Sequence, residues 1–300
     1  MVRPAAVVTL TVLLAAALGA QATPIIRNAA GLQLLVGEEN TQPTLRLVLP
    51  GRAMSDRAIE ILFPEHVTGT RRGTTSSEHL YVFRPGRVLS GQRPRWRSNG
   101  QSLEYESDLP GAVHLLARAT LEDDGVRFHY ELSNRSDSAF SMIYAVTDPR
   151  LTSIFHDERL ERTWVHHRNG FDLLASETPS RLTLPLSEWL PARYLASFTW
   201  PVPTRRVERR TDGITYYNKS RAVDEPFIAT VSTDGQWVVA SFTREVGNVW
   251  SNPELTCQHV DPQTSLAAHA EAVLEVKVLV LKGSLDAALT RAMAQRPSLK

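Results

Sequence analysis

Hydrophobic and polar residues alternate with a period of two along much of this chain. Apolar residues occupy every second position over residues 113–121, and do so again over residues 126–132. This pattern is typical of a strand with one buried and one polar face. An acidic turn that ends in glycine, residues 123–125, separates the two runs. Together they predict an antiparallel hairpin, with His114 and His129 on its polar face.

A second hairpin is predicted further along the chain. Two runs rich in β-branched and aromatic residues, 227–232 and 236–243, flank Asp234 and Gly235, a pair that tolerates the positive φ of a tight turn. A late run, residues 272–282, alternates with Glu275 and Lys277 on its outward side. Shorter strands are expected at residues 32–36, 45–49, 59–63, 80–83, 103–107 and 141–146.

Helical patterns are scarce. Residues 284–295 begin with a capping serine and continue with helix formers, in which Leu285, Leu289 and Met293 recur at helical spacing. Many short strands, turns throughout and no change of composition favour one domain over residues 23–300. We therefore predict an all-β fold, a large antiparallel sandwich with few helices and a short C-terminal helix.

The first 22 residues have the character of an export signal. Arg3 precedes an apolar run over residues 5–18, and Ala20-Gln21-Ala22 matches the small-x-small cleavage pattern. The run is shorter than the roughly 20 residues of a membrane-spanning helix, although an uncleaved anchor is the alternative. We expect cleavage before Thr23 and a protein that is periplasmic or secreted, with no membrane association afterwards.

Net charge bears on whether the chain can bind nucleic acid, and cysteine content on whether it can form a disulfide. The chain has 33 basic and 32 acidic residues, and loss of Arg3 with the signal would leave the two in balance. A nucleic-acid-binding protein needs a clustered basic surface, so no nucleic-acid partner is expected. Cys257 is the only cysteine; it forms no internal disulfide, and we expect it to be a small buried side chain.

Residues 153–177 concentrate candidate chemistry. His156, His166 and His167 lie there among acids and arginines, together with Trp164. Sugar sites combine aromatic faces with fixed polar groups, which makes this segment a candidate saccharide surface that includes Arg162. In an extended strand His166 and His167 would point to opposite faces. The competing interpretation is a salt-bridged polar belt that only supports the fold.

Two segments resemble a known superfamily. Residues 125–140 and residues 252–285, with the element Cys257-x-His259-x-x-Pro262, are similar to the galactose-mutarotase-like, or aldose-epimerase-like, β-supersandwiches. The resemblance implies a carbohydrate ligand. It also implies, where there is catalysis, a histidine acid and a glutamate base, for which His156, His166 or His167 and Glu254 stand in the right order, with Glu177 as another choice for the base.

The predicted function is thus an exported carbohydrate-binding protein that, if it is an enzyme, acts as a sugar epimerase or lyase. Further ligand contacts are expected from Trp164, Trp250, Asn252 and His259. No cofactor is expected and no metal ligand is assigned, because the histidines and acids lack zinc-type spacing. A non-catalytic structural module of the cell envelope and a metal-dependent enzyme are the alternatives.

Overall fold

The computed structural model describes residues 24–37, 42–83, 94–177, 193–199, 207–209, 214–245, 248–252 and 256–300. Strands dominate these residues and fall into four sheets, so the predicted all-β class is confirmed. The predicted signal, residues 1–22, lies outside the described residues.

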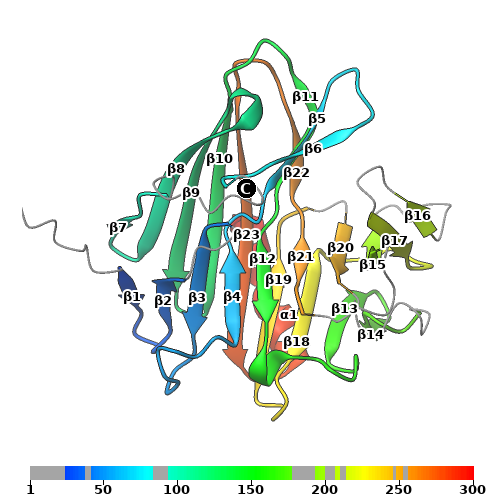
Figure 1. The fold of residues 1–300 in the computed structure, drawn as a ribbon. Coiled ribbons are helices and arrows are strands. Elements are labelled where there is room, and N and C mark those ends of the chain that lie inside the picture. Colours follow the sequence, from blue (N-terminus) through cyan, green and yellow to red (C-terminus); the bar gives the residue numbers. More distant parts are fainter. Residues whose placement is uncertain are drawn as a thin grey trace, which may run out of the picture.

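A five-stranded antiparallel sheet forms one layer, drawn in dark to light blue and green in Figure 1. Its strands, in spatial order, are β1 (Ile25–Arg27), β2 (Gln33–Val36), β3 (Thr44–Val48), β4 (Ile59–Leu62) and β12 (Asp148–Leu151). The last strand comes from much later in the chain and completes the edge beside β4.

A nine-stranded sheet lies behind it (Figure 1) and provides the second layer. Its strands, in spatial order, are β14 (Gly170–Leu173), β13 (Thr163–His167), β18 (Phe227–Val231), β19 (Trp237–Phe242), β23 (Glu271–Lys282), β10 (Gly125–Asn134), β9 (Val113–Glu122), β8 (Ser102–Leu109) and β7 (Arg97–Asn99). All its pairings are antiparallel.

Two smaller sheets complete the described part of the fold. One projects at the top of Figure 1 and contains β22 (Gln263–Leu266), β11 (Phe140–Ala145), β5 (Val67–Arg71) and β6 (Ser77–Leu80). The other contains β16 (Val207–Arg209), β17 (Ile214–Asn218), β15 (Arg193–Thr199), β20 (Asn248–Ser251) and β21 (His259–Val260). Strands β15 and β17 run parallel to each other.

Both predicted hairpins are confirmed. Strands β9 and β10 pair around a turn that ends at Gly125, and β18 and β19 pair around a turn in which Gly235 has φ +68°. A Cβ on Gly125 would lie 2.1 Å from the carbonyl oxygen of Val278, so no other residue fits there. The short strand predicted at residues 80–83 is displaced in the structure. The observed strand β6 ends at Leu80, which is the only residue that the two share.

The main core fills the space between the two large layers. Side chains such as Leu45 and Ile61 from the five-stranded sheet are fully buried with Phe128 from the nine-stranded sheet. Tyr105 is buried in the same core and donates its hydroxyl hydrogen to the carbonyl of Phe63. Burial of this kind provides the main driving force for folding, and it fixes the edge strand β12 on which part of the candidate site sits.

The predicted C-terminal helix is α1 (Leu285–Gln295), capped by the Ser284 side chain at the amide of Ala287. It covers the opposite face of the nine-stranded sheet, where Ala288 and Ala292 are fully buried against Phe242. Short 3-10 turns are η1 (Pro110–Ala112), η2 (Ser153–Phe155) and η5 (Arg296–Ser298). Within the described residues no helix is long and apolar enough to cross a membrane.

The outward position predicted for Glu275 and Lys277 needs correction. Both lie on the polar face of β23, but both are buried, Lys277 completely. The ammonium group of Lys277 contacts the carboxylates of Glu122 and Asp124, while Arg291 from α1 contacts Asp124 as well. The alternation identified the face correctly, but the C-terminal helix and the tail cover that face.

Candidate functional site

The histidines of β13 point to opposite faces, as their alternation predicts. His167 is buried and its Nδ1–H donates to the carbonyl of Ala222 over 2.8 Å, while its Nε2 lies 3.8 Å from a carboxylate oxygen of Asp172. His166 is partly exposed, and its Nδ1 contacts the carboxylate of Glu225. Each ring has its own carboxylate, so the two histidines do not form one centre.

The neighbouring candidates hold the backbone in place. Arg162 donates to the carbonyls of Val231 and His156, and the buried Asp157 accepts from the amides of Glu161 and Arg162 over 3.0 and 2.9 Å. Arg162 thus binds carbonyl groups of its own chain, as the polar-belt alternative predicts, and the saccharide surface in this segment stays a prediction.

The other site residues predicted in this segment each have their own neighbours in the structure. The side chain of His156 is 40% exposed, with Glu158 at 3.5 Å. Trp164 lies on the same side of β13 as His166 and is partly exposed. Glu177 accepts hydrogen bonds from the amide and the hydroxyl of Ser220, and Glu254 lies outside the described residues.

A different group of side chains converges where β12 meets the segment before β21. Cys257 forms an isolated bridge with Arg150, the amide of Leu151 donates to the carbonyl of Thr256 over 2.8 Å, and the amide of Gln258 donates to the carbonyl of Pro149. This pairing joins the five-stranded layer to the sheet that contains β20 and β21. It brings Asp148 next to Cys257 and His259.

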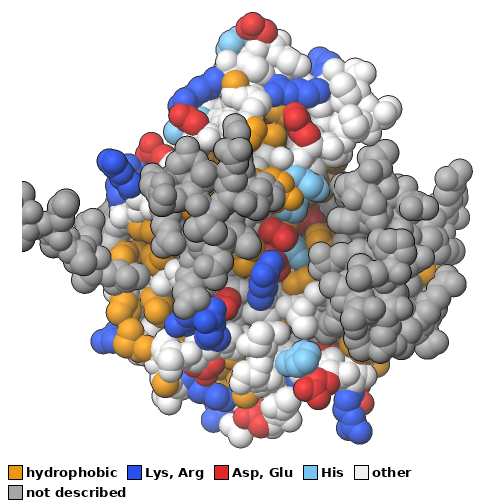
Figure 2. Space-filling model, viewed as in Figure 1, with side chains coloured by type: hydrophobic (Ala, Val, Ile, Leu, Met, Phe, Trp, Pro, Cys, Tyr) orange, Lys and Arg blue, Asp and Glu red, His pale blue; other side chains and the backbone are white. Residues whose placement is uncertain are grey.

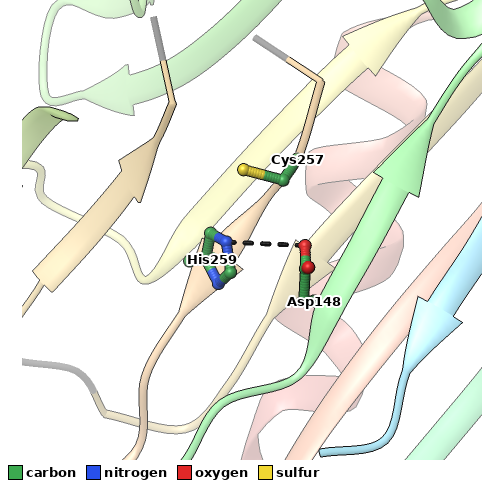
Figure 3. A group of neighbouring side chains, drawn as sticks. All are labelled: Asp148, Cys257 and His259. Carbon is green, nitrogen blue, oxygen red and sulfur yellow. Dashed lines mark ion pairs between the residues drawn. The ribbon is translucent and has the colours of Figure 1, made fainter. Parts of the chain in front are cut away.

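The three side chains form a buried polar cluster. Nε2 of His259 lies 3.5 Å from Oδ1 of Asp148, and the candidate ligand atoms of Asp148, Cys257 and His259 all lie within 4.8 Å of one another. The three residues are 3%, 8% and 2% exposed. Figure 3 shows the imidazole and the carboxylate pointing toward each other, with the thiol beside them.

An indole packs on the imidazole of this cluster. Trp250 of β20 is the cross-strand partner of His259 in β21, and their rings stack with centroids 3.7 Å apart and planes within 5°. The indole N–H donates to a carboxylate oxygen of Asp261, which lies two residues after His259 and hence on the same side of the extended chain. Trp250 is partly exposed, so the stack connects the buried cluster to the surface.

Asn252 shapes the loop beside the stack. Its side chain donates to Thr256 Oγ1 over 2.7 Å and accepts from the Thr256 amide over 2.9 Å. Its own amide donates to Sγ of Cys257 over 3.5 Å. The structure therefore brings Trp250, Asn252 and His259 of the predicted ligand set together.

Charged and aromatic groups surround the cluster on the side of β5. Arg150, with its side chain 49% exposed, donates to Asp148 over 2.9 Å and lies 3.7 Å from Glu65. His66 follows Glu65, and its ring packs against that of His79 with centroids 4.2 Å apart and planes tilted by 58°. Figure 2 shows histidine and acidic side chains gathered in a hollow at the middle of this face, below the projecting sheet of β5, β6 and β11.

Burial and charge set the ionisation of the cluster. Burial, chiefly, and the nearby charge of Asp148 raise the pKa of the Cys257 thiol well above its ordinary value. Burial alone would lower the pKa of Arg150, but the charges of Asp148 and Glu65 outweigh it and leave that pKa raised. Cys257 is thus a neutral thiol near neutral pH when nothing is bound to it, and Arg150 is a permanent cation.

Sequence reasoning did not predict that Asp148 and Cys257 lie together with His259 in one cluster. The alternation Cys257-x-His259-x-Asp261 places three polar side chains on one side of an extended segment, and this was the signal available. Asp148 carries no such signal, because its position depends on a pairing between distant parts of the chain.

Comparisons with known proteins give only distant matches. No family model matches the sequence, and no curated protein matches it significantly. Among solved structures, the chain is similar to a galactose mutarotase related enzyme from Lactobacillus acidophilus, with 11% identity over 88% of this chain and 98% of that one, at a TM-score of 0.47.

Two further structures match to the same degree. A galactose mutarotase-like protein from Lactobacillus casei is 13% identical over 86% of this chain and 100% of that one, with a TM-score of 0.47. A protein from Synechocystis sp. PCC 6803 is 12% identical over 87% and 96%, also at 0.47. Matches at this level do not establish a family for this chain, so the resemblance stays a prediction and the ligand must be inferred from the chain's own side chains.

Proposed function

We propose that this protein binds a saccharide at the exposed parts of Trp250 and Arg150, whose side chains contact the buried His259, Asp261 and Asp148. The observation that carries the proposal is the parallel stack of Trp250 on His259 with a carboxylate hydrogen-bonded to the indole. The stack is held between two strands by backbone pairing, so its orientation is fixed before a ligand arrives.

The chemistry of these groups suits a sugar. A pyranose ring has an apolar C–H face that packs on an aromatic ring, and hydroxyl groups that need fixed donors and acceptors. Trp250 offers an aromatic surface that is partly exposed. The half-exposed guanidinium of Arg150 can donate hydrogen bonds to hydroxyls, and the carboxylate of Glu65, 3.7 Å from it, can accept them.

The pairing of His259 with Asp148 suggests one reaction that the same site could catalyse. Exchange of sugar anomers requires a proton to be delivered to the ring oxygen and another to be removed from the anomeric hydroxyl. His259, with Asp148 at 3.5 Å, is the group we propose for one of these transfers. NMR saturation transfer between the α and β anomers of a bound aldose measures the reaction, and a rate equal to that in buffer would exclude it.

We also propose export, which the sequence of residues 1–22 supports. Expression of the full chain in a Gram-negative host, followed by fractionation and N-terminal sequencing, tests this point. The expected product starts at Thr23 and is found outside the cytoplasm, whereas an intact N-terminus in the cytoplasmic fraction would contradict it.

A thermal-shift screen against monosaccharides, their phosphates and soluble polysaccharides tests the binding proposal. A ligand that binds only the folded state stabilises it by RT ln(1 + L/Kd), where L is the free ligand concentration, so the melting temperature rises with ligand concentration. We expect at least one saccharide class to raise it for the wild type and not for Trp250→Ala. A Trp237→Ala variant, altered in β19, serves as the control. If no class stabilises the protein, the structural-module interpretation replaces this proposal.

A further inference from the structure

We propose that Asp148, Cys257 and His259 form a binding site for a divalent transition metal ion of the zinc or cobalt type. The cluster supplies one carboxylate oxygen, one thiol sulfur and one imidazole nitrogen from two segments that backbone pairing holds together. This inference goes beyond saccharide binding and does not rest on it. With the ion bound, Nε2 of His259 is a ligand, so the proton transfer proposed above for His259 belongs to the metal-free protein.

The separation of the donor atoms is close to that in a metal site. Bond lengths of about 2.0–2.3 Å in tetrahedral zinc sites place neighbouring ligand atoms about 3.3–3.8 Å apart. Nε2 of His259 and Oδ1 of Asp148 already meet this requirement at 3.5 Å. The remaining separations are within 4.8 Å, so rotation of the Cys257 side chain and small shifts close the site.

Neighbouring groups orient the ligands in the way that metal sites require. Arg150 holds Oδ2 of Asp148 from one side, while Oδ1, which faces His259, is buried and accepts no hydrogen bond from the described residues. The stack on Trp250 fixes the imidazole plane, and the amide of Asn252 points at the sulfur. Such outer contacts set the orientation and basicity of metal ligands.

The donor types select the class of ion. Thiolate and imidazole favour zinc, cobalt and similar ions over magnesium and calcium, which prefer oxygen ligands. A thiolate and a carboxylate together neutralise a divalent charge, and three protein ligands leave a fourth position for water or a ligand hydroxyl. Binding must displace the thiol proton, so the affinity is expected to rise with pH.

Cobalt titration of the purified metal-free protein tests the site. A cobalt–thiolate bond produces a charge-transfer absorption band in the near ultraviolet, and Cys257 is the only cysteine that could produce it. We expect the band to saturate at one cobalt per chain, to disappear on addition of zinc and to weaken as the pH is lowered. No saccharide is present, so the result is independent of the proposed function.

Substitutions of the proposed ligands distinguish loss of metal binding from loss of folding. Cys257→Ser is expected to abolish the band, and Asp148→Asn to weaken cobalt binding by at least tenfold. The control is His269→Ala, which alters an exposed histidine beside Asp137 and should leave the titration unchanged. Circular dichroism monitors folding of each variant. If a variant does not fold, the wild-type titration still decides: no thiolate band at saturating cobalt would overturn the proposal.

Discussion

Trp250 and His259 show how single residues gain a role from their register. Neither side chain has an unusual sequence context, yet the pairing of β20 with β21 places them face to face. Their cross-strand contact is of the kind that stabilises sheets, and the partly exposed indole gives it a surface that a ligand can reach.

Replacement of Trp250 by phenylalanine should weaken saccharide binding. The smaller ring keeps an aromatic face but has no indole N–H to donate to Asp261. We expect the dissociation constant to rise about tenfold, equivalent to about 1.4 kcal/mol. Isothermal titration calorimetry measures it, with Trp237→Phe as the control variant, and an unchanged constant would remove Trp250 from the site.

His167 predicts a pH dependence of stability. Burial, and then the charge of Arg221, lowers the pKa of His167 below its ordinary value. The unfolded chain therefore binds a proton more readily than the folded one, and the free energy of unfolding falls as the pH drops through about 6.5. The loss stops once the pH is below the folded-state pKa.

Urea unfolding of the wild type and His167→Gln over pH 5–8 tests this account. The difference between the two free energies of unfolding should shrink as the pH falls, because only the wild type loses this contribution. His156, whose side chain is 40% exposed, is changed to glutamine as the control. A difference that stays constant with pH would show that His167 titrates alike in both states.

The strand β23 and the helix α1 show how an element can change the surroundings of another. Lys277 lies on the polar face of its strand, but Glu122 and Asp124 surround its ammonium group, and α1 contributes Arg291. Burial would raise the pKa of each carboxyl, yet Lys277 and its neighbours leave both pKa values lowered. The group acts as a charged connection between β23 and the turn before β10.

Removal of Lys277 should destabilise the protein strongly. In Lys277→Ala two half-buried carboxylates lose their main cation, and loss of one partner of a buried ion pair costs about 3–5 kcal/mol. Urea unfolding at pH 7 measures the change. The variant Lys282→Ala, at the exposed end of the same strand, should differ from the wild type by less than about 0.5 kcal/mol.

The pH dependence of this variant provides an independent check. Glu122 and Asp124 stabilise the wild type above their unfolded-state pKa values, near pH 4, and this stability is lost as the pH falls through their lowered folded-state values. Lys277→Ala should be less sensitive to acid over this range. Equal acid sensitivity in the two proteins would contradict the role given to Lys277.

Across the whole molecule, local patterns predicted the elements but not the contacts between layers. The hairpins followed from alternation and from their glycine turns. Alternation also placed Lys277 on its face, yet nothing in the sequence showed that α1 and the tail cover it. The grouping of Asp148 with Cys257 and His259 could not be predicted for the same reason, since it depends on pairing of β12 with a segment far along the chain.

In the histidine-rich segment, residues 153–177, the sequence predicted a site where the structure shows contacts within the chain. Its composition favoured a site, but Arg162 binds the carbonyl of Val231, 69 residues away, and Asp157 binds the amide of Glu161. Residue types alone do not distinguish a ligand surface from a polar belt, because both satisfy buried polar groups with charge. The distinction depends on whether the side chains bind their own chain, which only the tertiary structure reveals.

The most direct test of the proposed saccharide site follows the indole N–H resonance of Trp250 by two-dimensional NMR. The resonance is assigned with Trp250→Phe, and the protein is titrated with the saccharide that stabilises it most. A sugar at the proposed surface must shift the Trp250 signal in a saturable manner, while that of Trp237 stays in place. Saturable binding that leaves the Trp250 resonance unmoved would contradict the account.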